Sequence, residues 1–248
     1  LRMRESITVL IIFLFSLSIT LFSQKTITEE DQQWLQYYNE TVINPNLSFN
    51  FDGGIRFRNG VSDLRAALIR TGLGYRIYKP IWGISGIALF SFFENFGLNR
   101  LEIRPYQDFF ANTALGKGML RHRFRVEGRY FTNYHPDGHK AGNEFYFRIR
   151  YGLNFLFPLV KLSKKNPERK LLLNLADEVF INAGPTIVYN MFDNNRAIAG
   201  LAFQENQNLR ISLLYNFQFG QRNAPGAYNM THVLWLTVNH RLIPKSKK

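Results

Sequence analysis

The residues of this chain with the clearest chemical capacity are arginines spaced two apart. Between positions 121 and 129 the sequence places Arg121, Arg123, Arg125, Glu127 and Arg129 at every second position. A guanidinium presents a planar fork of N–H donors that can hold a carboxylate or a phosphate with two hydrogen bonds. If these side chains share one face, they predict either a site for anionic groups or a dense set of internal ion pairs.

The element that must position these arginines is a β-strand. The even positions of the same stretch include Phe124, Val126 and Tyr130, and such alternation is typical of a strand with one polar and one apolar face. Because other segments repeat the pattern, arginines of different strands can share one polar face. The expected lumen-lining basic residues are Arg56, Arg58, Arg70, Arg76, Arg123, Arg125, Arg129, Arg148, Arg150 and Arg210.

Two interpretations of this arginine face stay open. Asp52 and Glu127, with Glu102 and Asp108, can pair with part of the charge and make the interior of a narrow barrel rigid. Alternatively, surplus guanidiniums form an anion-selective channel or a pocket for an anionic lipid or sugar.

Alternation predicts about eleven strands. They cover residues 34–43, 47–58, 63–78, 81–96, 100–116, 121–131, 144–158, 171–181, 196–204, 209–220 and 232–243, with a further short strand at 186–189. Turns are expected at Asn59–Gly60 and at Gly116–Lys117–Gly118, where glycine and asparagine accept positive φ. Segments of this length suit a tilted membrane wall better than a soluble sandwich.

These strands predict an all-β fold, an antiparallel transmembrane β-barrel of about 10–12 strands. Aromatic residues make up 15% of the chain, with 23 Phe and 12 Tyr, as expected for girdles at two membrane interfaces. Bacterial single-chain barrels have even strand numbers, so we expect ten or twelve strands, with the uncertain one at 186–189.

The first residues predict export. Arg2 and Arg4 precede an almost uncharged run over residues 7–22, and Ser23 follows. This order is typical of a secretory signal. We predict a signal peptide over residues 1–23, cleaved before Gln24, and a barrel domain over residues 24–248; the alternative is an uncleaved N-terminal anchor. The sequence contains no Cys, which excludes disulfides, thiolate metal sites and a lipoprotein anchor.

The formal net charge is +13, and removal of Arg2, Arg4 and Glu5 with the signal leaves +12. A basic balance can favour nucleic acid, anionic lipid or anionic solutes. Nucleic acid is not expected, because the arginines follow strand spacing and no binding motif is present. The expected partners are outer-membrane lipids, the barrel-assembly machinery and small anionic solutes.

Enzymatic and metal chemistry have weak support. The sequence contains no Gly-x-Ser-x-Gly motif, and no His lies two residues from a Ser. His135, Asp137 and His139 share one polar loop, which we interpret as a solvated Asp–Gly turn rather than a metal site. The segment Asp193–Asn194–Asn195 lacks the glycine and the distal glutamate of a calcium loop. We therefore expect no catalytic residue, no metal and no cofactor.

Four stretches carry a resemblance to a known family. They are H-R-F-R-V-E-G-R-Y at 122–130, L-I-R-T-G-L-G-Y at 68–75, Asn194–Asn195–Arg196 and Gln33–Trp34. Together they resemble the domain-of-unknown-function 2490 family over roughly residues 33–242. The resemblance implies an exported barrel of the outer membrane of Gram-negative bacteria, and it carries no activity.

The expected function is therefore that of an outer-membrane β-barrel, structural or a small-solute pore, with an arginine-rich lumen. The alternatives are a barrel-type lipid-modifying enzyme and a soluble periplasmic β-protein that binds an anionic lipid.

Overall fold

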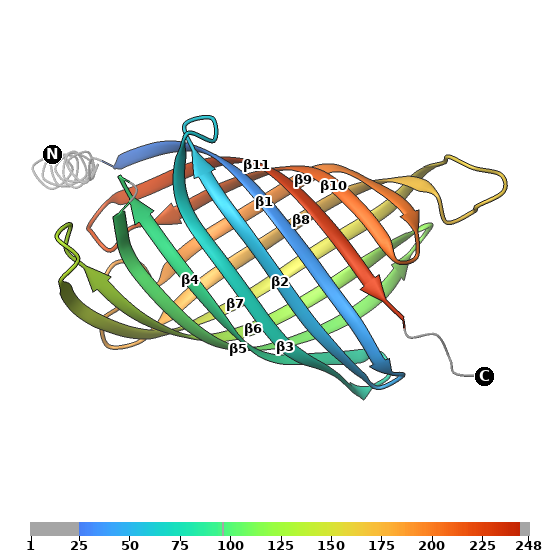
Figure 1. Ribbon diagram of the computed structural model, residues 1–248, viewed down its shortest axis with the longest axis horizontal. Coiled ribbons are helices and arrows are strands. Elements are labelled where there is room, and N and C mark those ends of the chain that lie inside the picture. Colours follow the sequence, from blue (N-terminus) through green and yellow to red (C-terminus); the bar gives the residue numbers. More distant parts are fainter. Residues whose placement is uncertain (1–24, 96, 244–248) are drawn as a thin grey trace, which may run out of the picture.

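The computed structural model describes residues 25–95 and 97–243 as strands joined by turns and loops. The strands are β1 (Thr26–Asn44), β2 (Leu47–Arg58), β3 (Asp63–Tyr78), β4 (Ile81–Glu94), β5 (Gly97–Leu115), β6 (Gly118–Tyr134), β7 (Lys140–Lys161), β8 (Lys170–Ala183), β9 (Phe192–Asn206), β10 (Leu209–Gln221) and β11 (Ala227–Leu242). Each strand pairs with its neighbours in sequence, and β11 pairs with β1, which closes a barrel (Figure 1). The predicted all-β barrel of 10–12 strands is confirmed.

Two sequence predictions lie outside the strands listed above, for different reasons. The predicted signal peptide, residues 1–23, lies outside the described residues. The short strand predicted at 186–189 is wrong, because this segment belongs to the loop between β8 and β9. Within the described residues, no helix is long and apolar enough to cross a membrane.

The expected even strand number is also wrong. Eleven strands that alternate in direction leave the first and the last running the same way, so the barrel can close only through a parallel pair. β1 and β11 form that pair in an uninterrupted register from Thr26↔Ala227 to Thr41↔Leu242. The other junctions, from β1–β2 to β10–β11, are antiparallel.

The predicted faces are confirmed by burial. Along β7, Tyr146, Arg148 and Arg150 are buried, whereas Phe147 and Ile149 between them are exposed. β10 alternates in the same way. Large exposed apolar side chains cover the outer wall through its middle, and they include Leu35, Ile69, Leu89, Ile103, Ile149, Leu175, Leu213 and Leu236.

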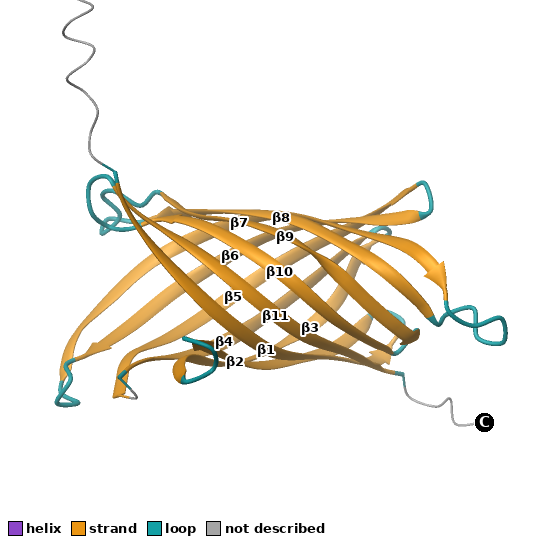
Figure 2. Ribbon diagram, turned by 90° about the horizontal axis from the view of Figure 1, so that it is seen from above, coloured by secondary structure: helices purple, strands orange, loops and turns teal. Residues whose placement is uncertain are grey.

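The two ends of the barrel differ. We call the end where β1 starts the N-terminal rim and the end where β11 finishes the C-terminal rim (Figures 1 and 2). At the C-terminal rim four of the five connections are two-residue turns, and the exception is the loop 162–169. Lys79, Lys117, Lys164 and Lys165 lie in these connections, so this rim is basic.

The predicted turn residues adopt the expected backbone. Asn59 and Gly60, at the N-terminal rim, have φ of 53° and 67°, and Gly116, at the C-terminal rim, has φ of 59°. Positive φ is accessible to glycine and tolerated by asparagine, so Asn59, Gly60 and Gly116 adopt it at little cost. Val61 in the first turn also has a positive φ of 67°, which is strained for a β-branched residue.

Candidate functional site: the arginine-rich interior

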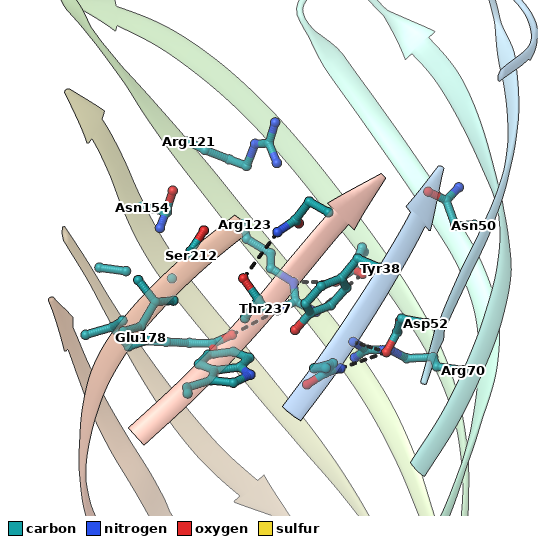
Figure 3. Close-up of a pocket in the computed structure, with 18 of the residues that line it drawn as sticks. Tyr38, Asn50, Asp52, Arg70, Arg121, Arg123, Asn154, Glu178, Ser212 and Thr237 are labelled. Atoms are coloured by element: carbon teal, nitrogen blue, oxygen red, sulfur yellow. Dashed lines mark hydrogen bonds and ion pairs between the residues drawn. The ribbon is translucent and has the colours of Figure 1, made fainter. Parts of the chain in front are cut away.

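The barrel encloses a cavity of about 750 Å³, which we call the main cavity. Its lining reaches Gln207 and Asn208 in a turn of the C-terminal rim and extends inward to Trp34 and Arg129. Figure 3 shows Arg121 at one side of this cavity and the paired Asp52 and Arg70 at another. The cavity therefore reaches the basic rim, and its volume is typical of small-molecule sites.

A second cavity of about 590 Å³ adjoins the first. It shares Glu40 and Arg121 with the main cavity and is lined by Lys79 and Pro80 of the C-terminal rim. Both cavities thus reach the C-terminal rim.

Side chains fill the interior toward the N-terminal rim. Gln32, Phe131, Tyr146, Asn182 and Thr231 are all at most 9% exposed. Neither of the two cavities is lined by a residue from the turns of this rim. The filling matches the narrow width expected of a barrel with this strand number.

Eight of the ten predicted arginines line the main cavity, and two do not. Arg76 lines the second cavity, where its Nη2 donates to the carbonyl of Pro45 at 3.0 Å. Arg58 lies at the N-terminal rim, where it pairs with Asp63, and it lines neither cavity. Alternation assigns a residue to a face of the sheet, but it does not fix its depth along the barrel.

The structure adds arginines that the sequence prediction left out. Arg104, Arg121, Arg196 and Arg241 also line the main cavity. Arg104 precedes Pro105, which obscures the strand pattern. Arg196 follows a break in pairing, because Phe180 pairs with Asn194 and Ile181 pairs with Phe192. Asp193 is left between them as a bulge, and the bulge turns its carboxylate inward to accept from Arg148 Nη1 at 3.0 Å.

Glu127 is the centre of the interior ion network. Its side chain is fully buried, and its carboxylate oxygens lie 2.6 Å from Arg148, 2.9 Å from Arg150 and 3.1 Å from Arg125. Arg104 Nη1 lies 3.8 Å away. The register explains this convergence, since β6 places Glu127 directly opposite Arg148 on β7. Several guanidiniums around one buried carboxylate compensate its desolvation, which a single partner rarely achieves.

Three other carboxylates extend the network. Glu102 receives Nε–H donations from Arg104 at 2.7 Å and Arg129 at 2.6 Å. Asp108 binds Arg123 and Arg125. Further along the wall, Glu178 binds Arg150 at 2.8 Å, Arg123 at 3.4 Å and Arg196 at 3.7 Å.

The inner end of the main cavity is built around Trp34. The guanidinium carbon of Arg56 lies 3.8 Å from the centre of the Trp34 ring, and that of Arg196 lies 5.4 Å from it. Trp235 packs its edge against the same indole, with centroids 5.4 Å apart. Two cations therefore approach one aromatic ring, and the ring attracts both through its quadrupole.

Three arginines of the cavity lack an acidic partner. Within residues 25–95 and 97–243, no carboxylate oxygen lies within 4.0 Å of a guanidinium nitrogen of Arg56, Arg121 or Arg210. Arg121 donates from Nε to Asn112 at 3.0 Å. Arg56 therefore leaves surplus positive charge at the inner end of the main cavity, and Arg121 and Arg210 leave it near the C-terminal rim, which we call the mouth of the cavity.

The outer wall carries the histidines in pairs with tyrosines. His122, His232 and His240 each place Nδ1 against a hydroxyl, of Tyr151 at 2.9 Å, Tyr215 at 2.6 Å and Tyr37 at 3.1 Å. In the described residues no hydrogen bond joins a Ser hydroxyl to a His ring. Ser85 bonds to Tyr75 and Gln107 instead.

The loop 135–139 forms a turn rather than a ligand set. The amide of Gly138 donates to the carbonyl of His135 at 2.9 Å, and that of His139 donates to Asp137 Oδ1 at 3.0 Å. Across the described chain no group of three or more His, Cys, Asp or Glu is arranged to hold a metal.

Comparison with known proteins gives one family. A family model described as a protein of unknown function, DUF2490, matches residues 31–229. No curated protein matches the chain.

Proposed function

The chain belongs to the DUF2490 family, which brings no activity with it, and from the geometry we propose that it is an outer-membrane β-barrel with a basic interior for small anionic solutes. The observation that carries the proposal is the distribution of side chains. Apolar side chains are exposed around the outer wall, while arginines and carboxylates are buried inside. An exposed apolar surface of this extent requires a lipid or protein partner, and inverted polarity is typical of membrane barrels.

Solute passage in this proposal is restricted. The main cavity reaches the C-terminal rim, and side chains fill the interior next to the opposite rim. We therefore expect a structural or small-solute barrel of low conductance rather than a wide channel. Its partners would be outer-membrane lipids around the wall, the barrel-assembly machinery during insertion and small anions in the cavity.

The two alternatives receive less support. A lipid-modifying enzyme needs a nucleophile activated by a neighbouring base, and the three histidines of the outer wall pair with tyrosines. A soluble lipid-binding protein needs an apolar interior, yet an acyl chain here would lie against ion pairs such as Glu127–Arg148.

The test is fractionation followed by gel mobility. We expect the protein to stay in the outer membrane after carbonate extraction and to shift in apparent size when boiled in detergent. Release by carbonate, or identical mobility before and after boiling, would contradict the proposal.

A further inference from the structure

We propose that the inner end of the main cavity, between Arg56 and Arg196 beside Trp34, is a binding site for one small oxyanion such as a phosphate or carboxylate group. The inference deepens the proposed function, on which it rests for access from solution through the C-terminal rim.

The first argument is the charge at this position. Arg56 has no carboxylate within 4.0 Å in the described chain, and Arg196 reaches only Glu178, at 3.7 Å. Glu178 is held more closely by Arg150 at 2.8 Å and by Arg123 at 3.4 Å. The charges of Arg56 and Arg196, which both line the main cavity beside the Trp34 indole, are therefore poorly neutralised by carboxylates. A bound anion would offset their repulsion.

The second argument is unsatisfied hydrogen bonding. The Nε atoms of Arg56 and Arg196 are both buried without a partner among the protein groups. Arginine only donates, so its N–H groups need an acceptor. Gln218 is 7% exposed, and its Oε1 accepts from Asn194 at 2.8 Å, while its Nε2 has no acceptor. The Nε1 of Trp235 also lacks one. One acceptor nearby, Asn194 Oδ1, is also buried without a partner, so unpaired donors still outnumber unpaired acceptors. A surplus of buried donors favours a ligand that only accepts, such as a phosphate or a carboxylate.

The third argument is preorganisation. The Arg56 guanidinium is held against the Trp34 ring at 3.8 Å, and Trp34 is fixed in turn by the bond from its Nε1 to Gln32 Oε1 at 2.6 Å. Phe180 supports Arg196, with its ring centre 4.9 Å from the guanidinium carbon. Because neighbouring rings and amides already hold these donors, an anion would lose little binding free energy to ordering them.

The experiment is a fluorescence titration of the folded protein in detergent. Trp34, Trp82 and Trp235 are the three tryptophans of the chain, so a Trp82→Phe background restricts the signal to the proposed site. Inorganic phosphate and acetate are added separately at constant ionic strength, with chloride as the reference salt. We expect a saturable change with an oxyanion and none with chloride; the two probes show whether a phosphate or a carboxylate group is preferred.

Arg56→Gln and Arg196→Gln should each weaken binding by about tenfold or more, the value of one charged hydrogen bond. The matched control is Arg222→Gln, which removes the same charge from an exposed loop of the N-terminal rim. Each variant is first shown to keep its heat-dependent gel shift; Arg56→Lys, which keeps the charge, serves if Arg56→Gln does not fold.

Absence of a saturable change in folded wild-type protein would overturn the site, as would equal losses in Arg222→Gln and Arg56→Gln. The two proposals fail separately. Binding by a protein that washes off the outer membrane refutes the location and keeps the site, whereas a heat-shifting outer-membrane protein that binds neither anion refutes the site alone.

Discussion

Trp34 and Trp235 are directly paired across the parallel junction of β1 and β11, and their rings meet edge to face at 74°. Both side chains point inward. The junction that closes the barrel is thus reinforced from inside by the two aromatic residues that also border the proposed anion site.

Trp235→Ala should weaken this junction. Loss of a large aromatic side chain from a packed interior costs about 3–5 kcal/mol, with part of the loss due to the edge-to-face contact. The measurement is the temperature at which the gel shift occurs in detergent, and it should fall. Leu234→Ala, at the neighbouring exposed position, is the control and should change it much less. Equal effects would mean that the ring pair does not stabilise closure.

Glu127→Gln should destabilise the barrel more than other charge removals. The buried carboxylate faces Arg148, Arg150 and Arg125, and neutralising it leaves buried cations uncompensated, at a cost of about 3–5 kcal/mol. Urea unfolding in lipid vesicles measures the loss. Glu144→Gln removes an exposed carboxylate 4.0 Å from Arg100 and should cost at most about 1 kcal/mol. The network would not be a stabilising element if both variants unfolded at the same urea concentration.

Arg121→Glu combined with Arg210→Glu should reduce any preference for anions. Both residues line the main cavity and neither has an acidic partner in the described chain, so reversal changes the field near the mouth without breaking an ion pair. Reversal potentials in planar bilayers under a salt gradient measure the preference. Arg222→Glu on the exposed loop of the other rim is the control. An unchanged reversal potential in the double variant would show that ions do not pass these residues.

Asp177→Leu should stabilise the protein in a bilayer. Asp177 is exposed on the outer wall near the middle of β8, where Asn195 Nδ2 donates to it at 3.1 and 3.2 Å. A carboxylate facing lipid costs up to about 2 kcal/mol at mid-depth. The urea midpoint in vesicles should therefore rise. Asp31→Leu, on the outer face of β1 nearer the rim, should have little effect. A loss of stability in Asp177→Leu would contradict a lipid-facing position.

The fold could be predicted from the sequence because polar and apolar residues alternate along a strand that has one polar and one apolar face. β7 shows this well: between Phe147 and Phe155 its apolar positions alternate with Arg148, Arg150, Gly152 and Asn154, and the predicted faces match the burial. Alternation also indicated eleven strands, but the rule of even counts led to the expectation of ten or twelve. The rule of even counts describes barrels closed by antiparallel pairs, and nothing in the local pattern of β1 or β11 distinguishes a parallel partner from an antiparallel one.

The candidate site was only partly predictable. Parity indicated that Arg56 and Arg150 share a face. Depth along the barrel depends on the stagger between strands, so parity could not show that Arg58 lies at the N-terminal rim, away from the cavities. Arg196 has the same parity as the buried Ala202 of β9, but it is the first residue of the predicted strand 196–204, where no earlier alternating residue indicates its face. The inner end of the main cavity combines Trp34, Arg56 and Arg196 from three strands, β1, β2 and β9. These residues come close to one another only when the sheet closes into a barrel.

Because β1 and β11 run in parallel, the start of β1 and the end of β11 lie at opposite rims of the barrel. Lys25 precedes β1 at one rim, and Ile243 follows β11 at the other (Figure 1). In a bilayer around this wall, the two ends would belong to different compartments. A peptide tag before Thr26 and another after Leu242 would thus be reached by antibody or protease from opposite faces of the membrane, whereas a barrel of whole hairpins would show both tags to the same side.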